Sequence, residues 1–252
     1  MKFNRIAMAA AVALVAALPL SAMSQTAVKL ELGLLVDVSG SVSATEFDLQ
    51  KNGYVNAFND AAIQASIASG NSLAVSLFYW SGTSEQSQAV GWTLVSTAAQ
   101  ASAFASAIAA TTRPFSGSTA PGSAINFAAP TFFSNAFTSD RQVIDVSGDG
   151  AQNVGADTLT ARNAALALGI DQINGLPILG EAGLLAFYQN NIQGGVGSFT
   201  TAANSFTDFD AAVKFKIGKE IVNSVPEPET YAMMLAGLAA LGIVARRRKQ
   251  AR

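Results

Sequence analysis

The sequence predicts an α/β fold, in which a doubly wound, mostly parallel central sheet is flanked by helices. Strand-like segments alternate with segments of helical periodicity between the two ends of the chain. Short loops rich in Gly and Ser join them, and several strand segments are continuous apolar runs, as expected for strands buried on both faces. We therefore expect one α/β domain over residues 25–224, with binding residues at the carboxyl ends of its strands.

The first half of this domain contains the clearest strand and the clearest helix. Residues 28–36, VKLELGLLV, begin with alternation and end as an apolar run, which predicts a strand entering a buried sheet. After a short loop, apolar residues recur at helical spacing up to Gly70, which predicts one amphipathic helix. Two further strands are predicted at 72–80 and 89–95.

The second half continues the alternation. The alanine-rich stretch 97–110 favours a helix because alanine has the highest helix propensity. The remaining helices are predicted at 123–133, 156–168, 183–191 and 208–222. The remaining strands are predicted at 143–147 and 172–179, with a weak one at 198–203.

The amino-terminal end predicts export. Lys2 and Arg5 precede an uncharged apolar stretch, and Ala22 and Ser24 stand at the small-residue positions of a cleavage site before Gln25. Residues 1–24 are therefore expected to be a signal peptide, removed by signal peptidase. The alternative is an uncleaved anchor helix, but the apolar stretch is shorter than the roughly 20 residues that span a membrane.

The carboxyl-terminal end predicts sorting at the membrane. A Pro-Glu-Pro step at 226–228 precedes an apolar segment, 231–245, and then a basic cluster at 246–249, which stays in the cytoplasm. These features resemble a PEP-CTERM sorting tail over residues 225–252. The resemblance implies that the tail holds the chain in the membrane until an exosortase cuts it, and that the product reaches the cell envelope, cell surface or extracellular matrix. A plain anchor is the alternative.

Composition excludes several function classes. Residues 25–225 contain 8 Lys and Arg against 15 Asp and Glu, a net charge of −7, so nucleic acid is not an expected partner. The chain contains no cysteine, which excludes disulfides and thiolate-bound zinc. It also contains no histidine, which excludes Ser-His and Cys-His catalysis and imidazole metal sites.

The strongest local motif directly follows the first predicted strand. Asp37, Ser39 and Ser41 alternate along an Asp-x-Ser-x-Ser sequence between that strand and the long helix. One carboxylate and two hydroxyls form a set of hard oxygen ligands, which Mg²⁺ prefers. The alternative for this pentapeptide alone is a helix cap formed by Ser41 or Ser43.

Two later loops strengthen the metal-site hypothesis, because Thr119 and Asp149 are expected at the same edge of the sheet. Together with Asp37, Ser39 and Ser41, they resemble the metal-ion-dependent adhesion site (MIDAS) of von Willebrand factor A (vWA) domains. More narrowly, the sequence VIDVSGDG with a preceding arginine resembles the DUF1194 branch of that superfamily. The resemblance implies a vWA/Rossmann-like fold and a Mg²⁺ or Mn²⁺ ion held by these five residues, to which a carboxylate of a partner adds the last ligand.

Two positions depart from, or compete with, that assignment. The family often has two glycines before the threonine, and here Ser118 takes the place of the second one. Asp145 competes with Asp149, but it lies inside the predicted strand, where an unpaired carboxylate is costly. We therefore expect Asp149 to reach the ion and Asp145 to be structural.

The expected function is metal-dependent adhesion or ligand binding outside the cell, not catalysis. The partner would be an extracellular protein or polysaccharide that offers a carboxylate. One alternative is a structural matrix component whose metal site only stabilises the fold. A second is a Mg²⁺-dependent phosphohydrolase with Asp37 as nucleophile, but Ser39 stands where a second carboxylate would be expected.

Overall fold

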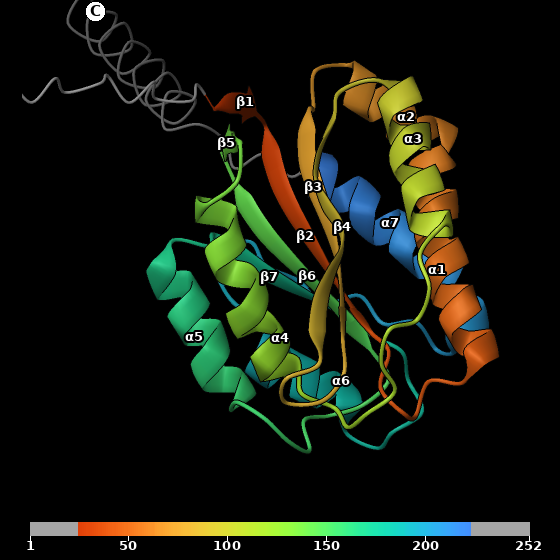
Figure 1. Cartoon of the computed structure of the whole chain (residues 1–252), viewed down its shortest axis with the longest axis vertical. Helices are drawn as coiled ribbons and strands as arrows, with labels where there is room; N and C mark the ends of the chain where they lie inside the picture. Colours follow the sequence, from red (N-terminus) through yellow and green to blue (C-terminus); the bar gives the residue numbers. More distant parts are fainter. Residues whose placement is uncertain (1–24, 223–252) are drawn as a thin grey trace, which may run out of the picture.

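The computed structural model describes residues 25–222, which form a five-stranded sheet with helices on both faces (Figure 1). The strand order is β4-β3-β2-β6-β7. Four neighbouring strands, β3, β2, β6 and β7, run parallel to one another, and the edge strand β4 runs antiparallel to β3. The strands are β2 (Leu30–Asp37), β3 (Leu73–Trp80), β4 (Gln86–Val95), β6 (Gln142–Gly148) and β7 (Gln172–Pro177). The prediction of a mostly parallel, helix-flanked sheet is confirmed.

The helices divide into two groups, each covering one face of the sheet (Figure 1). The first group is α1 (Ala44–Asn59), α2 (Ala61–Ala68), α3 (Ala98–Ala109) and α7 (Phe209–Val222). The second group is α4 (Pro121–Ala128), α5 (Thr158–Leu168) and the single turn α6 (Leu184–Phe187). Each group packs on its own apolar core, so both faces of the sheet are buried from solvent.

The structure differs from the sequence prediction in four local details. The helix expected up to Gly70 is broken at Asp60, whose carboxylate accepts hydrogen bonds from the backbone N–H groups of Ala62 and Ile63 and so starts α2. The helix expected at 183–191 continues past α6 as a π-helix, Tyr188–Ile192. The weak strand at 198–203 makes only isolated bridges to the β7 region, and a two-stranded sheet of β1 (Thr26–Val28) and β5 (Phe137–Ser139) was not expected.

The register of the sheet brings the ends of its central strands together. Asp37, the last residue of β2, lies opposite Trp80, the last residue of β3, and Val36 lies opposite Ser147 of β6. The loops that follow β2 and β6 therefore leave the sheet at one edge. A capping box at Ser43 and Glu46 then starts α1 immediately after the first of these loops.

The two terminal predictions fall outside the described part of the chain. The signal peptide (1–24) and the sorting tail (225–252), including its apolar segment 231–245, lie beyond residues 25–222. Within residues 25–222, no helix is long and apolar enough to cross a membrane.

Candidate metal site

Asp37 is the most deeply buried of the predicted metal ligands. It ends β2 and is fully buried. Its Oδ1 accepts a hydrogen bond from the backbone N–H of Ser39, at 2.7 Å, while its Oδ2 has no hydrogen-bond partner among the described residues. A buried carboxylate oxygen without a partner is costly, and a cation is the simplest group that would satisfy it.

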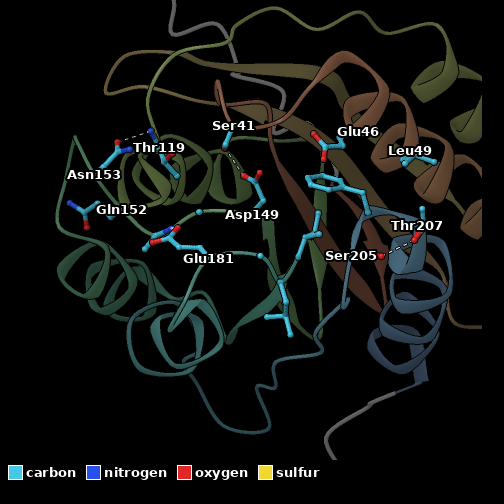
Figure 2. Close-up of a pocket in the computed structure, with 16 residues that line it drawn as sticks. Ser41, Glu46, Leu49, Thr119, Asp149, Gln152, Asn153, Glu181, Ser205 and Thr207 are labelled. Carbon is cyan, nitrogen blue, oxygen red and sulfur yellow. Dashed lines mark hydrogen bonds between the residues drawn. The ribbon is translucent and has the colours of Figure 1, made fainter.

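A chain of hydrogen bonds links the two serines to Asp149. The hydroxyls of Ser39 and Ser41 lie 3.2 Å apart and share a hydrogen bond. The Ser41 hydroxyl donates its proton to Oδ1 of Asp149, at 2.7 Å, and so accepts from Ser39 (Figure 2). The residues after β2 and β6 are therefore in direct contact, although they are more than a hundred positions apart in the sequence.

Thr119 lies beside this chain, in the loop before α4. Its backbone N–H donates to Oδ1 of Asn153 at 2.9 Å, and the N–H of Asn153 donates back to the carbonyl of Thr119 at 3.0 Å. Its hydroxyl lies 3.5 Å from the point where a Cβ on Gly150 would stand, so Thr119 is adjacent to the residue that follows Asp149. The structure thus brings all five predicted residues to one edge of the sheet.

Asp145, the competing aspartate, lies away from this edge. It is in the middle of β6, fully buried, and its Oδ1 lies 2.5 Å from Nζ of Lys216 on α7. Asp145 lies inside the strand, as predicted. Its cationic partner is not evident from the sequence, because Lys216 follows 71 positions later in a helix whose register periodicity alone does not define.

Several supporting residues had no signal in the sequence. Arg113 is the clearest case: its guanidinium donates to the carbonyls of Val38 and Ser39, at 2.9 and 2.7 Å from Nη2, and to the carbonyl of Phe115 from Nε. Gln50 donates from Nε2 to the carbonyl of Asp37 at 3.1 Å. These two side chains hold the backbone of the Asp-x-Ser-x-Ser loop, and only the tertiary structure shows that they reach it.

The glycine before Asp149 has a steric role. A Cβ on Gly148 would stand 2.6 Å from Oδ2 of Asp37 and 2.9 Å from the hydroxyl of Tyr188, which is itself buried and has no hydrogen-bond partner in the described part of the chain. No side chain larger than hydrogen therefore fits at residue 148 unless Asp37 or Tyr188 moves. Gly148 lets the carboxylate of Asp37 lie against the end of β6.

The electrostatics of the site disfavour ionised carboxylates when no cation is bound. Burial raises the pKa of Asp37 from 3.8 to about 7, hydrogen bonds from Ser39 partly offset this, and the charge of Asp149 adds to it. Burial also raises the pKa of Asp149, with further contributions from Glu46 and Glu181 and an opposing hydrogen bond from Ser41. A divalent cation would favour the ionised form of both groups.

The site opens into a cavity of about 720 Å³. Figure 2 shows Glu46 and Glu181 on opposite sides of Asp149, with Gln152, Asn153, Ser205 and Thr207 further out. Among residues 25–222, no lysine or arginine lines the cavity, whereas Leu49, Ile178 and Phe206 do. A bound ligand would therefore meet amides, hydroxyls, carboxylates and apolar side chains, but no cationic side chain of the described residues.

The residues present fit a hard divalent cation. They offer two carboxylates and three hydroxyls, all oxygen ligands, with one buried oxygen free of partners. Within residues 25–222, no group of three or more Asp, Glu, His or Cys side chains is arranged to hold a metal, so the hydroxyls would have to complete this ligand set. That composition excludes a soft-metal site of the thiolate or imidazole type.

Comparison of the sequence with protein families found two matches. Residues 27–225 match the family described as "Protein of unknown function (DUF1194)". The chain belongs to the DUF1194 family. Residues 224–249 match the PEP-CTERM protein-sorting motif, so the DUF1194 domain is exported and sorted to the cell surface or beyond. A search of curated proteins found no match.

The DUF1194 domain has the vWA fold. Solved structures similar to it include proximal thread matrix protein 1 (PTMP1) of the mussel byssus (TM-score 0.59, 15% identity, 77% of this chain and 48% of that one). Others are the pilus adhesin SpaC of Lactobacillus rhamnosus GG (0.58, 16%, 77% and 30%) and a von Willebrand factor type A protein of Catenulispora acidiphila (0.55, 14%, 79% and 44%). A further PTMP1 structure is described as having a zinc-occupied MIDAS motif (0.51, 16%, 77% and 47%). The chain matches less than half the length of each of these proteins.

Proposed function

We propose that this protein mediates metal-dependent adhesion or ligand binding outside the cell, through a Mg²⁺ or Mn²⁺ ion held by Asp37, Ser39, Ser41, Thr119 and Asp149. The observation that carries the proposal is the unpartnered, fully buried Oδ2 of Asp37 within an all-oxygen cluster. Two carboxylates neutralise a divalent ion, and the cavity beside it admits one further ligand from a partner. Matrix and adhesin proteins with the same fold support this class of function.

The partner group expected at the ion is a carboxylate from a protein or an acidic polysaccharide. Glu46 and Glu181 line the same cavity and would repel an anion that approaches the walls. A partner carboxylate would therefore be attracted only where it binds the ion directly, which makes binding dependent on the metal. Exosortase and signal peptidase are the expected processing enzymes, the former through the matched sorting motif.

Binding is favoured over catalysis at this site. As a phosphohydrolase nucleophile, Asp37 would need access to substrate, but its side chain is fully buried. Arg113, which holds the Asp-x-Ser-x-Ser loop, donates to backbone carbonyls and is not among the described residues that line the cavity. We therefore propose that the protein is not an enzyme.

Calorimetric titration of the protein with Mg²⁺ and Mn²⁺ tests the metal site. Wild type is expected to bind one ion, and Asp37→Ala and Asp149→Ala are each expected to abolish saturable binding while remaining folded. Asp48→Asn is the matched control, because it removes an exposed carboxylate on α1 that pairs with Lys51.

Three results would contradict or narrow the proposal. Absence of binding by wild type, or unchanged binding by both alanine variants, would refute the metal site. Metal binding without capture of any acidic peptide or uronate-containing polysaccharide would instead favour a structural matrix component whose ion only stabilises the fold. Turnover of a phosphate ester that is lost in Asp37→Asn would show that the protein is an enzyme.

A further inference from the structure

A second buried polar cluster lies between α7 and the sheet, separate from the candidate metal site. It consists of Lys216 and Glu220 of α7, Asp145 of β6 and Asn174 of β7, and each of these residues is at most 1% exposed. Nζ of Lys216 lies 2.5 Å from Oδ1 of Asp145 and 2.6 Å from Oε1 of Glu220. A lysine so deeply buried needs a reason, because burying three charges costs more than their attraction usually returns.

Oε1 of Glu220, which contacts the Lys216 amine, also accepts a hydrogen bond from the side-chain amide of Asn174. Nδ2 of Asn174 donates to Oε1 of Glu220 at 2.9 Å, so one oxygen contacts both the lysine amine and the asparagine amide nitrogen. The amide oxygen of Asn174 accepts a hydrogen bond from the backbone N–H of Phe199, at 3.0 Å. An amine, an amide, a shared carboxylate and a donor at the amide oxygen are the groups that an acyl transfer to lysine requires.

We propose that Lys216 and Asn174 join in an intramolecular isopeptide bond between Nζ and Cγ, with Glu220 as the proton carrier. This modification is independent of the metal site and of the binding function proposed above. It forms a covalent link between α7 and the edge strand β7, within the folded domain.

The step balances without any added reagent. Glu220 takes a proton from the Lys216 ammonium, and the neutral amine attacks Cγ of Asn174, whose carbonyl electron pair moves to the oxygen held by the Phe199 N–H. Glu220 passes its proton to Nδ2 and takes one from the attacking nitrogen. The Cγ–Nδ2 bond then breaks and ammonia leaves, so the cluster keeps its net charge and Glu220 ends protonated.

Asn174 is the electrophile in preference to Asp145, although both lie beside the lysine. An ionised carboxylate resists attack by an amine, whereas an amide polarised by a hydrogen bond at its oxygen accepts it. Asp145 instead holds Nζ in place. Burial raises the pKa of Asp145 to about 7, the ion pair with Lys216 opposes that rise by favouring the ionised form of Asp145, and the charge of Glu220 adds to the rise.

The position of the bond suggests a mechanical purpose. Of the described elements, α7 lies nearest in sequence to the sorting motif at 224–249, so a load applied at that end of the domain would reach α7 first. β7 is hydrogen-bonded to β6 within the parallel sheet. A bond from residue 216 to residue 174 would transfer that load from the terminal helix to the sheet and keep α7 from peeling away.

Tryptic mapping of the full chain, produced in an exporting host, tests the proposal. Trypsin does not cleave after a lysine whose amine is acylated, so residues 215–219 should remain one peptide and stay attached to peptide 163–214. The joined pair should be lighter than the sum of its two peptides by one ammonia molecule. Because the link is covalent, the two peptides should stay joined under denaturing conditions.

Two variants separate the chemistry from folding. Glu220→Gln keeps the shape of the side chain, but its amide cannot take up a proton from Lys216 and transfer it. The folded variant should therefore yield free peptides and normal cleavage after Lys216. Lys219→Arg, on the neighbouring face of α7 where Nζ lies 3.7 Å from the Phe199 ring centroid, should leave the link intact. A cooperative thermal transition confirms folding of each variant.

The proposal is overturned if wild type is cleaved completely after Lys216 and yields no joined pair. It is also overturned if residues 215–219 are instead joined to peptide 142–162 with the loss of one water molecule, because that peptide carries Asp145 and the result would make Asp145 the acyl partner. A folded Glu220→Gln variant that still forms the link would remove the proton-carrying role. If that variant does not fold, the wild-type map alone decides.

Discussion

The candidate metal site depends on Gly148 because glycine has no Cβ. Asp37 and Tyr188 approach the end of β6 from two sides, and both have a polar atom within 2.9 Å of the position where a Cβ at residue 148 would stand. Cβ atoms in proteins essentially never lie that close to another heavy atom, so a Cβ at residue 148 would force Asp37 or Tyr188 to shift. The carboxylate that we assign to the ion is therefore positioned by a glycine in the strand opposite.

Gly148→Ala is expected to weaken metal binding and to lower the free energy of unfolding by about 1–3 kcal/mol, because the new methyl group overpacks a fully buried contact. Chemical denaturation and metal titration of the same variant measure both effects. Gly91→Ala is the matched control, since Gly91 also lies in a strand but a Cβ there has no neighbour within 4 Å. Unchanged stability and metal affinity in Gly148→Ala would refute this positioning role.

At the residue level, the sequence predicts the candidate metal ligands that alternate after one strand. It does not predict the side chains that hold this loop from distant positions in the chain. The spacing of Asp37, Ser39 and Ser41 is local, so it could be recognised without a structure. Arg113 and Gln50 reach the same loop from distant positions and through backbone carbonyls, which carry no residue-specific signal. Such contacts depend on how α1 and the 111–120 loop pack, and periodicity does not encode that.

At the level of elements, two helix glycines allow a direct test of packing against propensity. Gly53 of α1 faces α7, and a Cβ there would stand 2.7 Å from the ring of Phe209. Gly218 of α7 has no neighbour within 4 Å of its Cβ position. Alanine has the higher helix propensity at both sites, by up to about 1 kcal/mol, so only packing distinguishes them.

Gly53→Ala is therefore expected to lower the free energy of unfolding by about 1–3 kcal/mol, because the clash with Phe209 outweighs the gain in propensity. Gly218→Ala is expected to raise it by up to about 1 kcal/mol. Thermal and urea unfolding of the two variants, side by side with wild type, measure the difference. Stabilisation by both substitutions would show that α1 and α7 are less closely packed than their contacts indicate.

The order and type of the main elements followed from the sequence because alternating strands and helices have different periods. The boundaries that failed are those set by a single side chain or by tertiary pairing. Asp60 restarts a helix within what the periodicity predicts as one element, since its carboxylate caps α2. Residues 198–203 resemble a strand in composition, yet in the fold they only border β7 through isolated bridges.

At the scale of the whole molecule, the site couples to global stability through its buried carboxylates. Asp37 is ionised easily in the unfolded chain but has a pKa of about 7 in the metal-free fold. Below about pH 4 the group is protonated in both states and costs nothing. As the pH rises towards 7, the unfolded chain loses this proton first, so the metal-free fold becomes less stable, by an amount on the order of 4 kcal/mol from this group alone.

Mg²⁺ should reverse that loss, since it favours the ionised carboxylate and binds only the folded protein. We expect Mg²⁺ to raise the melting temperature strongly at about pH 7.5 and only slightly at about pH 5, where protons compete for Asp37. Scanning calorimetry with Mg²⁺ or with a chelator, at both pH values, measures this. Asp37→Asn should abolish the Mg²⁺ effect and reduce the pH dependence to the part that Asp145 and Asp149 contribute, because burial raises the pKa of both of these residues as well. An equal Mg²⁺ effect at both pH values, or one that persists in Asp37→Asn, would show that the ion acts elsewhere on the protein.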